Sequence, residues 1–205
     1  MSSDRLQPGD ASSPLFVITG QLSAGKSTVS KALLDRYPHG YHIDIDGLRE
    51  MVTSGLASPL EWTDETDRQF GLAIQASAAI ARVYSDAGFA VAIEGGLDPA
   101  QVEMALARHG LRDRTVGIVL HPRLEVALDR NRTRRSKAFD TSILAGVMRE
   151  IDGDLARDGA RPGWHELDNS DESVDATVER ILSVAPFPPP ETPGAPRASQ
   201  AEPDR

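Results

Sequence analysis

Between residues 14 and 185, the hydrophobic and polar positions follow two alternating patterns. Short apolar runs rich in β-branched residues predict strands, and longer mixed segments predict helices. The predicted strands are residues 15–19, 41–46, 89–93, 115–120 and 164–167. The predicted helices cover 26–36, 65–86, 122–132, 140–157 and 173–184, and a further helix begins at residue 99. Strands separated by helices need crossover connections, so we expect an α/β fold: a parallel sheet of five strands with helices on both faces.

Residues with special backbone preferences mark several helix ends. Gly88 is expected just beyond the long helix 65–86, because glycine readily adopts the left-handed conformation that ends many helices. Asp98 and Pro99 predict the N-cap and first residue of the next helix. Asp140 similarly predicts the N-cap of the helix that runs to about residue 157.

The two ends of the chain differ from its centre. Residues 1–13 are polar and small, which predicts a disordered leader. Residues 186–205 contain seven of the 14 prolines. This tail has too little apolar surface to offset the entropy lost on ordering, so we expect it to be disordered. A polyproline II docking segment around 188–190 is the alternative. A single domain is therefore expected at 14–185.

Composition narrows the class of protein. The net charge of −9 is opposite to the basic surface with which proteins usually bind long nucleic acids, so no such partner is expected. The absence of cysteine excludes a disulfide framework, a zinc ribbon and a thiol nucleophile. The apolar runs are too short to span a membrane, and the N-terminus lacks the pattern of a secretory signal. We expect a soluble, cytoplasmic monomer or weak homodimer.

One motif predicts a specific chemistry. It consists of Gly20, Gln21, Leu22, Ser23, Ala24, Gly25, Lys26 and Ser27, which match G-x-x-x-x-G-K-[ST] after an apolar strand and at the start of a helix. In this motif backbone N–H groups surround a polyphosphate, Lys26 reaches the β and γ phosphates, and the Ser27 hydroxyl ligates Mg²⁺. Thr28 is a further candidate contact. The sequence therefore predicts binding of a nucleoside triphosphate, taken here as ATP, with Mg²⁺.

An acidic residue ends the second predicted strand. Ligands of open α/β sheets bind beyond the carboxyl ends of the strands, and Asp46 is expected to protrude there. Its carboxylate is suited to accept the proton of a hydroxyl that attacks the γ-phosphate, or else it caps a helix beginning near Leu48. Asp44 is expected to support the substrate side through hydrogen bonds. Arg49 either holds an anionic group or is a solvated helix arginine.

The third predicted strand also leads into an acid, Glu94, followed by Gly95 and Gly96. An acid beside the P-loop strand orders a water bound to Mg²⁺, so Glu94 is a candidate metal residue together with Ser27. Contact with the substrate and a purely structural turn are the alternatives.

Residues 130–137 hold five cations, and we expect them to form a small basic lid. Arginines that close over a transferring phosphoryl group stabilise its charge and exclude water. We group Arg132 and Arg134 with catalysis and Arg130 with the nucleotide, one set meeting phosphate while another stacks on adenine. A solvated basic face is the alternative for at least two of the five.

Residues 20–28 followed by Asp46-Gly47-Leu48-Arg49 resemble the small P-loop kinases, which include chloramphenicol phosphotransferase, gluconate kinase and zeta-toxin-like proteins. The resemblance covers about residues 15–184 and implies phosphorylation of a hydroxyl on a small molecule. It also implies that Asp46 is the base, as in chloramphenicol phosphotransferase, and that residues 168–170 lie near the adenine edge, where a turn or a cap is equally expected.

The leading expectation is thus an ATP-dependent kinase of a small hydroxyl-bearing molecule. The D-x-x-R spacing of Asp46 and Arg49 also resembles the polynucleotide kinases that phosphorylate a 5′-hydroxyl, although the acidic net charge counts against that substrate. A P-loop ATPase or nucleotide switch without an acceptor is the alternative from another class. The acceptor-side motifs are short and identify no substrate.

Overall fold

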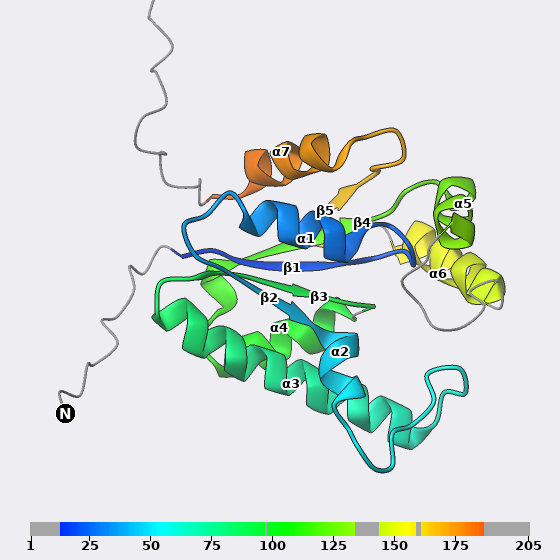
Figure 1. Ribbon diagram of the computed structural model, residues 1–205, viewed down its shortest axis with the longest axis horizontal. Coiled ribbons are helices and arrows are strands. Elements are labelled where there is room, and N and C mark those ends of the chain that lie inside the picture. The colour runs from blue at the N-terminus through cyan, green and yellow to red at the C-terminus, as the bar shows by residue number, and fades with distance from the viewer. Residues whose placement is uncertain (1–12, 97, 134–143, 159–160, 187–205) are drawn as a thin grey trace, which may run out of the picture.

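Five parallel strands form one sheet in the order β2-β3-β1-β4-β5 (Figure 1). The computed structural model describes residues 13–96, 98–133, 144–158 and 161–186. The strands are β1 (Leu15–Gly20), β2 (Gly40–Asp44), β3 (Ala90–Glu94), β4 (Thr115–Leu120) and β5 (Trp164–Leu167). The helices are α1 (Lys26–Leu34), α2 (Ile45–Glu50), α3 (Asp64–Asp86), α4 (Pro99–Arg108), the short 3₁₀ helix η1 (Arg112–Arg114), α5 (Leu124–Thr133), α6 (Ala145–Asp158) and α7 (Val174–Val184). The predicted five-stranded parallel sheet is confirmed.

Two hydrophobic cores cover the two faces of the sheet. Side chains alternate between faces along a strand, so Leu15 and Val17 of β1 pack in one core while Phe16 and Ile18 pack in the other. Helices α3 and α4 cover the first face, and α1 and α7 cover the second (Figure 1). Helices α5 and α6 lie at the end of the sheet to which β1 points (Figure 1). That arrangement leaves the carboxyl ends of the central strands facing the loops that carry the motif residues.

The predicted helix ends at Gly88 and Asp98 are confirmed. Gly88 has a φ of 85° just beyond α3. The Asp98 side chain accepts a hydrogen bond from the Ala100 N–H and so caps α4, in which Pro99 is the first residue. Helix α3 begins with a capping box, in which Thr63 and Thr66 satisfy each other's backbone N–H groups. The predicted cap at Asp140 lies outside the described residues, as do the leader 1–12 and the tail 187–205.

The predicted second strand was wrong at its end. Strand β2 stops at Asp44, whose side chain accepts a hydrogen bond from the Asp46 N–H at 3.0 Å and so caps helix α2. Asp46 therefore lies in the first turn of that helix, and its predicted capping of a helix near Leu48 is wrong. Ile43 and Ile45 alternate like strand residues in the sequence, but both are buried in the same core from two different elements.

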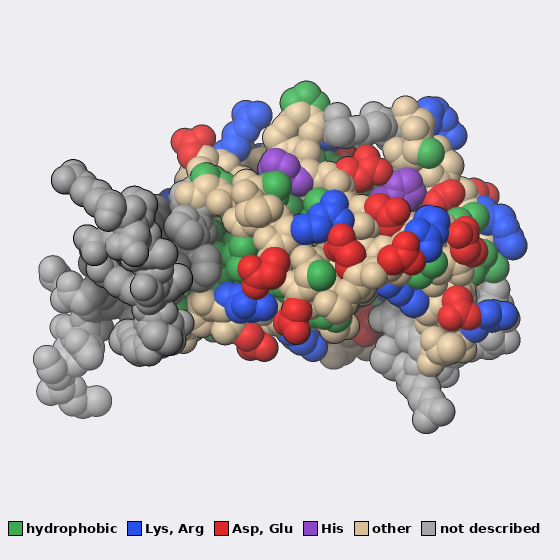
Figure 2. All heavy atoms as spheres, turned by 90° about the horizontal axis from the view of Figure 1, so that it is seen from above, with side chains coloured by type: hydrophobic (Ala, Val, Ile, Leu, Met, Phe, Trp, Pro, Cys, Tyr) green, Lys and Arg blue, Asp and Glu red, His purple; other side chains and the backbone are tan. Residues whose placement is uncertain are grey.

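The surface carries mixed charge where the molecule is seen from the side of α7. Figure 2 shows acidic and basic side chains interspersed on that face. Arg36, for example, pairs with both Asp175 and Glu179 of α7. Among the described residues, no helix has the length and apolar character that crossing a membrane requires.

His121 joins helix α6 to the sheet. It follows β4 directly. Its Nδ1 lies 2.7 Å from Glu166 Oε1 on β5, and its Nε2 lies 3.1 Å from Asp152 Oδ1 on α6. Burial alone would lower the pKa of His121, but the hydrogen bonds to Glu166 and Asp152 outweigh it and raise the pKa above 6.5. When the imidazole is protonated, it donates to both carboxylates and ties α6 to β5.

This bridge predicts a pH-dependent contribution to stability. A raised pKa in the folded state stabilises the protein fully below the unfolded pKa, and the gain is lost as pH rises through the folded pKa. Replacing His121→Asn should therefore lower the free energy of unfolding most at acidic pH. Urea denaturation of both proteins from about pH 5 to pH 9, across the range where histidine titrates, measures the difference. A difference independent of pH would contradict the assignment.

Candidate active site

The P-loop connects β1 to α1 through two glycines that no other residue replaces easily. Gly20 has a φ of 120°, and a Cβ there would lie 2.1 Å from the Leu120 carbonyl oxygen. Gly25 has a φ of 92° and forms the N-cap of α1 without a side-chain cap. The first N–H groups of α1 therefore meet no capping side chain, and a helix N-terminus of this kind favours an anion.

The Lys26 side chain folds back across the loop. Its Nζ donates to the carbonyl oxygens of Gly20 at 3.2 Å and Gln21 at 3.0 Å. These bonds hold the ammonium group beside the residues that the motif assigns to phosphate. The predicted contacts of Lys26 with the β and γ phosphates fit this position.

Ser27 and Glu94 meet beside the P-loop. The Ser27 hydroxyl donates to Glu94 Oε1 at 2.6 Å, and the Glu94 residue is 4% exposed. Burial alone would raise the pKa of Glu94, but the neighbouring His42, the Ser27 hydroxyl and the Lys26 ammonium outweigh it, so that the pKa is lowered. Glu94 is thus held as a carboxylate at neutral pH.

The side-chain oxygens of Ser27 and Glu94 have the chemistry that Mg²⁺ prefers. The ion prefers oxygen and is usually held by one or two protein groups together with substrate phosphates and water. The described residues contain no cluster of three or more acidic or histidine side chains that would form an all-protein metal cage. Ser27 and Glu94 are accordingly the residues that would hold the ion.

The residues predicted for the acceptor side lie next to this pair. Asp44 of β2 is in register with Glu94 of β3, and Asp46 follows in the first turn of α2. Arg49 is 4% exposed, so the predicted solvated helix arginine is wrong. Its Nη1 donates to the Ala57 carbonyl at 2.7 Å, and its guanidinium lies 4.8 Å from the centre of the Phe70 ring. Arg49 thus fastens the segment after α2 onto α3.

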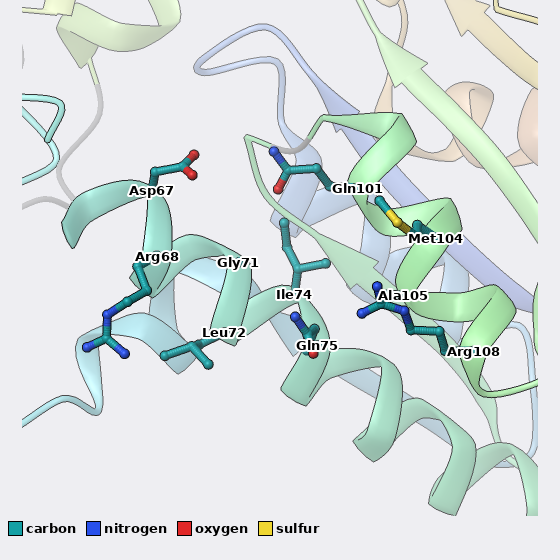
Figure 3. A pocket seen from close by; sticks show the side chains of 10 residues that line it. All are labelled: Asp67, Arg68, Gly71, Leu72, Ile74, Gln75, Gln101, Met104, Ala105 and Arg108. Atoms are coloured by element: carbon teal, nitrogen blue, oxygen red, sulfur yellow. The ribbon is translucent and has the colours of Figure 1, made fainter. Parts of the chain in front are cut away.

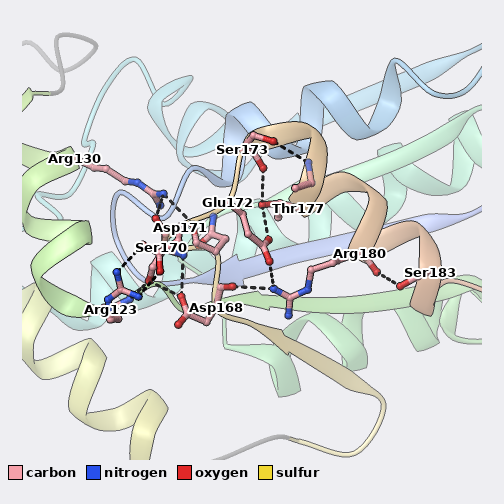
Figure 4. Close-up of polar contacts among 12 residues, drawn as sticks. Arg123, Arg130, Asp168, Ser170, Asp171, Glu172, Ser173, Thr177, Arg180 and Ser183 are labelled. Carbon is pink, nitrogen blue, oxygen red and sulfur yellow. Dashed lines mark hydrogen bonds and ion pairs between the residues drawn. The ribbon is translucent and has the colours of Figure 1, made fainter.

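A small cavity lies on the other side of the P-loop. It has a volume of about 160 Å³ and is lined by Gly25, Thr28, Arg130, Asn169 and Thr177 among others. Arg130 reaches from α5 to the loop after β5, where its Nη2 donates to the carbonyl oxygens of Asn169 at 3.0 Å and Ser170 at 3.3 Å (Figure 4). The sequence predicted that Arg130 binds the nucleotide and that residues 168–170 either lie near the adenine edge or form a turn or a cap. The structure brings Arg130 and Asn169 together at this cavity.

The stretch predicted to form a basic lid is only partly within the described residues. Arg132 lies on α5, is exposed and pairs with Asp129 one turn earlier. Arg134, the other arginine predicted to be catalytic, lies outside the described residues with the rest of the stretch to Lys137.

Two tertiary bonds of the P-loop were missed by sequence reasoning. Gln21 is fully buried and donates from Nε2 to the Met148 carbonyl of α6 at 2.9 Å. Ser23 donates to Asn131 Oδ1 of α5 at 3.3 Å. Both residues occupy positions at which the motif accepts any residue. The only signal in the sequence was that both side chains are polar and can form hydrogen bonds.

A larger cavity of about 370 Å³ lies away from these residues, between α3 and α4 (Figure 3). Leu72 and Met104 line it and are both about half exposed. None of the predicted site residues lines it, so its size alone does not make it the active site.

Comparison with known proteins agrees with the motif. No family model matches the sequence, and no curated protein matches it. The structure is similar to a sugar kinase from Janibacter sp. HTCC2649, with a TM-score of 0.61 and 17% identity over 83% of this chain and 93% of that one. The chain has the fold of the small-molecule P-loop kinases. The same fold relates it to the tunicamycin resistance protein of Deinococcus radiodurans, with a TM-score of 0.58 and 18% identity over 87% of this chain and 99% of that one. It also relates it to the APS kinase of Mycobacterium tuberculosis in complex with AMPPNP and APS, with a TM-score of 0.57 and 18% identity over 85% and 98% of the two chains.

Proposed function

We propose that the protein transfers the γ-phosphoryl group of MgATP to a hydroxyl of a small molecule. The observation that carries the proposal is the convergence of two sets of residues at one edge of the sheet. Lys26 and Ser27 represent the phosphate side, and Asp44 and Glu94, opposite each other in neighbouring strands, lead to the acceptor side. The fold supports the reaction class, and the structure of the mycobacterial APS kinase contains a non-hydrolysable ATP analogue.

On the nucleotide side, Lys26 would contact the β and γ phosphates, and the loop N–H groups and Thr28 would hold the rest of the polyphosphate. Arg130 and the cavity beside it would take the nucleoside. Mg²⁺, when bound by Ser27 and Glu94, would neutralise charge on the phosphates. Arg132 and Arg134 would stabilise the charge that spreads over the transferring group.

On the acceptor side, Asp46 would accept the proton of the attacking hydroxyl. A bond forms between the acceptor oxygen and the γ-phosphorus while the bond from that phosphorus to the β–γ bridging oxygen breaks, so ADP leaves. Asp44 holds the first turn of α2 through its bond to the Asp46 N–H and thereby orients the base. Glu94 would contact the acceptor directly. Arg49 would contribute to acceptor binding by holding the segment after α2 in place.

The decisive experiment is acceptor-dependent ADP release. The full chain with MgATP should release ADP slowly alone and at least about tenfold faster with a suitable hydroxyl compound, because transfer needs a positioned acceptor. Screening antibiotics, sugars and nucleosides while detecting the phosphorylated product by mass spectrometry measures this directly. ADP release that no acceptor raises, but that a protein partner does, would favour a nucleotide switch instead.

A further inference from the structure

The segment between α2 and α3 has an unusual surface. Five of the ten large apolar side chains that are at least 36% exposed among the described residues fall between residues 51 and 62. They are Met51, Val52, Leu56, Leu60 and Trp62, with exposed fractions of 73%, 36%, 44%, 59% and 64%. Exposed apolar side chains concentrated in this way mark binding sites more often than ordinary surface, since a soluble protein usually scatters them.

This apolar segment is attached to the acceptor side of the candidate active site. Trp62 stacks on Phe70 of α3, with ring centres 5.2 Å apart and planes 15° from parallel. Phe70 in turn lies against the guanidinium of Arg49, three residues after Asp46 on α2. The stack is therefore continuous with the helix that begins at the carboxyl end of β2, and α2 lies at that end of the sheet in Figure 1.

The charge around the segment is acidic. Residues 44–68 contain seven carboxylates and only two cations, Arg49 and Arg68. Arg68 makes two bonds to Glu65, at 2.8 and 2.9 Å, and Arg49 is buried against Ala57 and Phe70. Both cations are thus engaged within the protein, and an anionic acceptor would meet an excess of carboxylates here.

We infer that the acceptor side takes a neutral or cationic hydroxyl compound that carries an apolar or aromatic ring. This inference rests on the proposed function, because only a phosphoryl-transfer reaction has an acceptor. The ring packs on the exposed side of Trp62 and its apolar neighbours, and the hydroxyl extends towards Asp46. Aromatic rings pair favourably in stacked arrangements, and Trp62 already presents one covered and one accessible side. Sugar acids and phosphorylated acceptors are excluded by charge.

Two dyes with the same ring system test the surface independently of catalysis. N-phenylnaphthylamine is neutral, and anilinonaphthalene sulfonate adds one negative charge. With MgADP present to occupy the nucleotide site, the neutral dye should bind at least about tenfold more tightly, since like charges at an interface are strongly unfavourable. The double variant Leu60→Ser/Trp62→Ser should lose at least about fivefold in affinity for it, as loss of an aromatic anchor does.

The matched control is Leu72→Ser/Met104→Ser, which removes two similarly exposed apolar side chains from the cavity between α3 and α4 and should leave dye binding unchanged. Equal affinity for the two dyes, or undiminished binding by the Leu60/Trp62 variant, overturns the inference.

A comparison of two candidate acceptors, phenyl glucoside and gluconate, then separates this inference from the proposed function. More ADP release with phenyl glucoside supports both; more with gluconate overturns the inference and leaves the kinase standing. No release with any acceptor, despite selective dye binding, counts against the kinase alone.

Discussion

Asp46→Asn should reduce phosphoryl transfer by about 10²–10⁴-fold, the usual scale for loss of a general base. Asparagine has nearly the same shape, but its amide is a far weaker proton acceptor than a carboxylate. Asp46 does not cap α2, since Asp44 does, so the variant should unfold with a free energy within about 1 kcal/mol of the wild type. ATP affinity should also be unchanged. Product formation with an identified acceptor, together with ATP titration and urea denaturation, measures the three quantities.

Two further variants, one at each end of α2, separate catalysis from local structure. Glu50→Gln removes an exposed carboxylate at the other end of α2 and should leave turnover intact. Asp44→Ala removes the N-cap bond to the Asp46 N–H and should cost about 1 kcal/mol of stability. Full activity of Asp46→Asn would move the role of base to Asp44 or Glu94, or show that the reaction needs none.

Lys26→Ala should slow transfer by about 10²–10³-fold, the scale seen when one preorganised donor to developing charge is removed. The Lys26 ammonium donates to two carbonyls of its own loop, so the fold should survive its removal. Calorimetric titration with MgATP should show weaker binding, because the contact with the β and γ phosphates is lost.

Lys31→Ala is the matched control for Lys26. Lys31 is exposed and lies in the last turn of α1, whereas the P-loop precedes the first turn of that helix. Its replacement should change neither MgATP affinity nor turnover. Undiminished binding and turnover in Lys26→Ala would instead rule out the P-loop assignment.

The sheet was predictable because its strands are short apolar runs between clear helix signals. Strands β4 and β5 were predicted at their observed bounds, and β1 and β3 within one residue. Strand β2 was extended too far, because Ile43 and Ile45 mimic the two-residue period of a strand. The side-chain bond from Asp44 to the Asp46 N–H decides the boundary, and a hydrophobic pattern carries no information about such a bond.

The candidate site was predictable where a local motif fixes it and not where tertiary contacts do. The P-loop residues follow from their spacing alone. The meeting of Ser27 with Glu94 depends on the order of strands in the sheet, which sequence alternation does not encode. The burial of Arg49 likewise depends on Phe70 and Ala57, which belong to later segments of the chain.

The anchoring of Gln21 and Ser23 limits how freely the P-loop of this protein is interchangeable with others. The consensus leaves both positions open, yet here Gln21 is fastened to α6 and Ser23 to α5. A loop transplanted from another protein with this motif would retain the glycine-rich backbone and lose both attachments. Protein engineers who exchange this motif would need to treat it as one module with Asn131 and the first turn of α6.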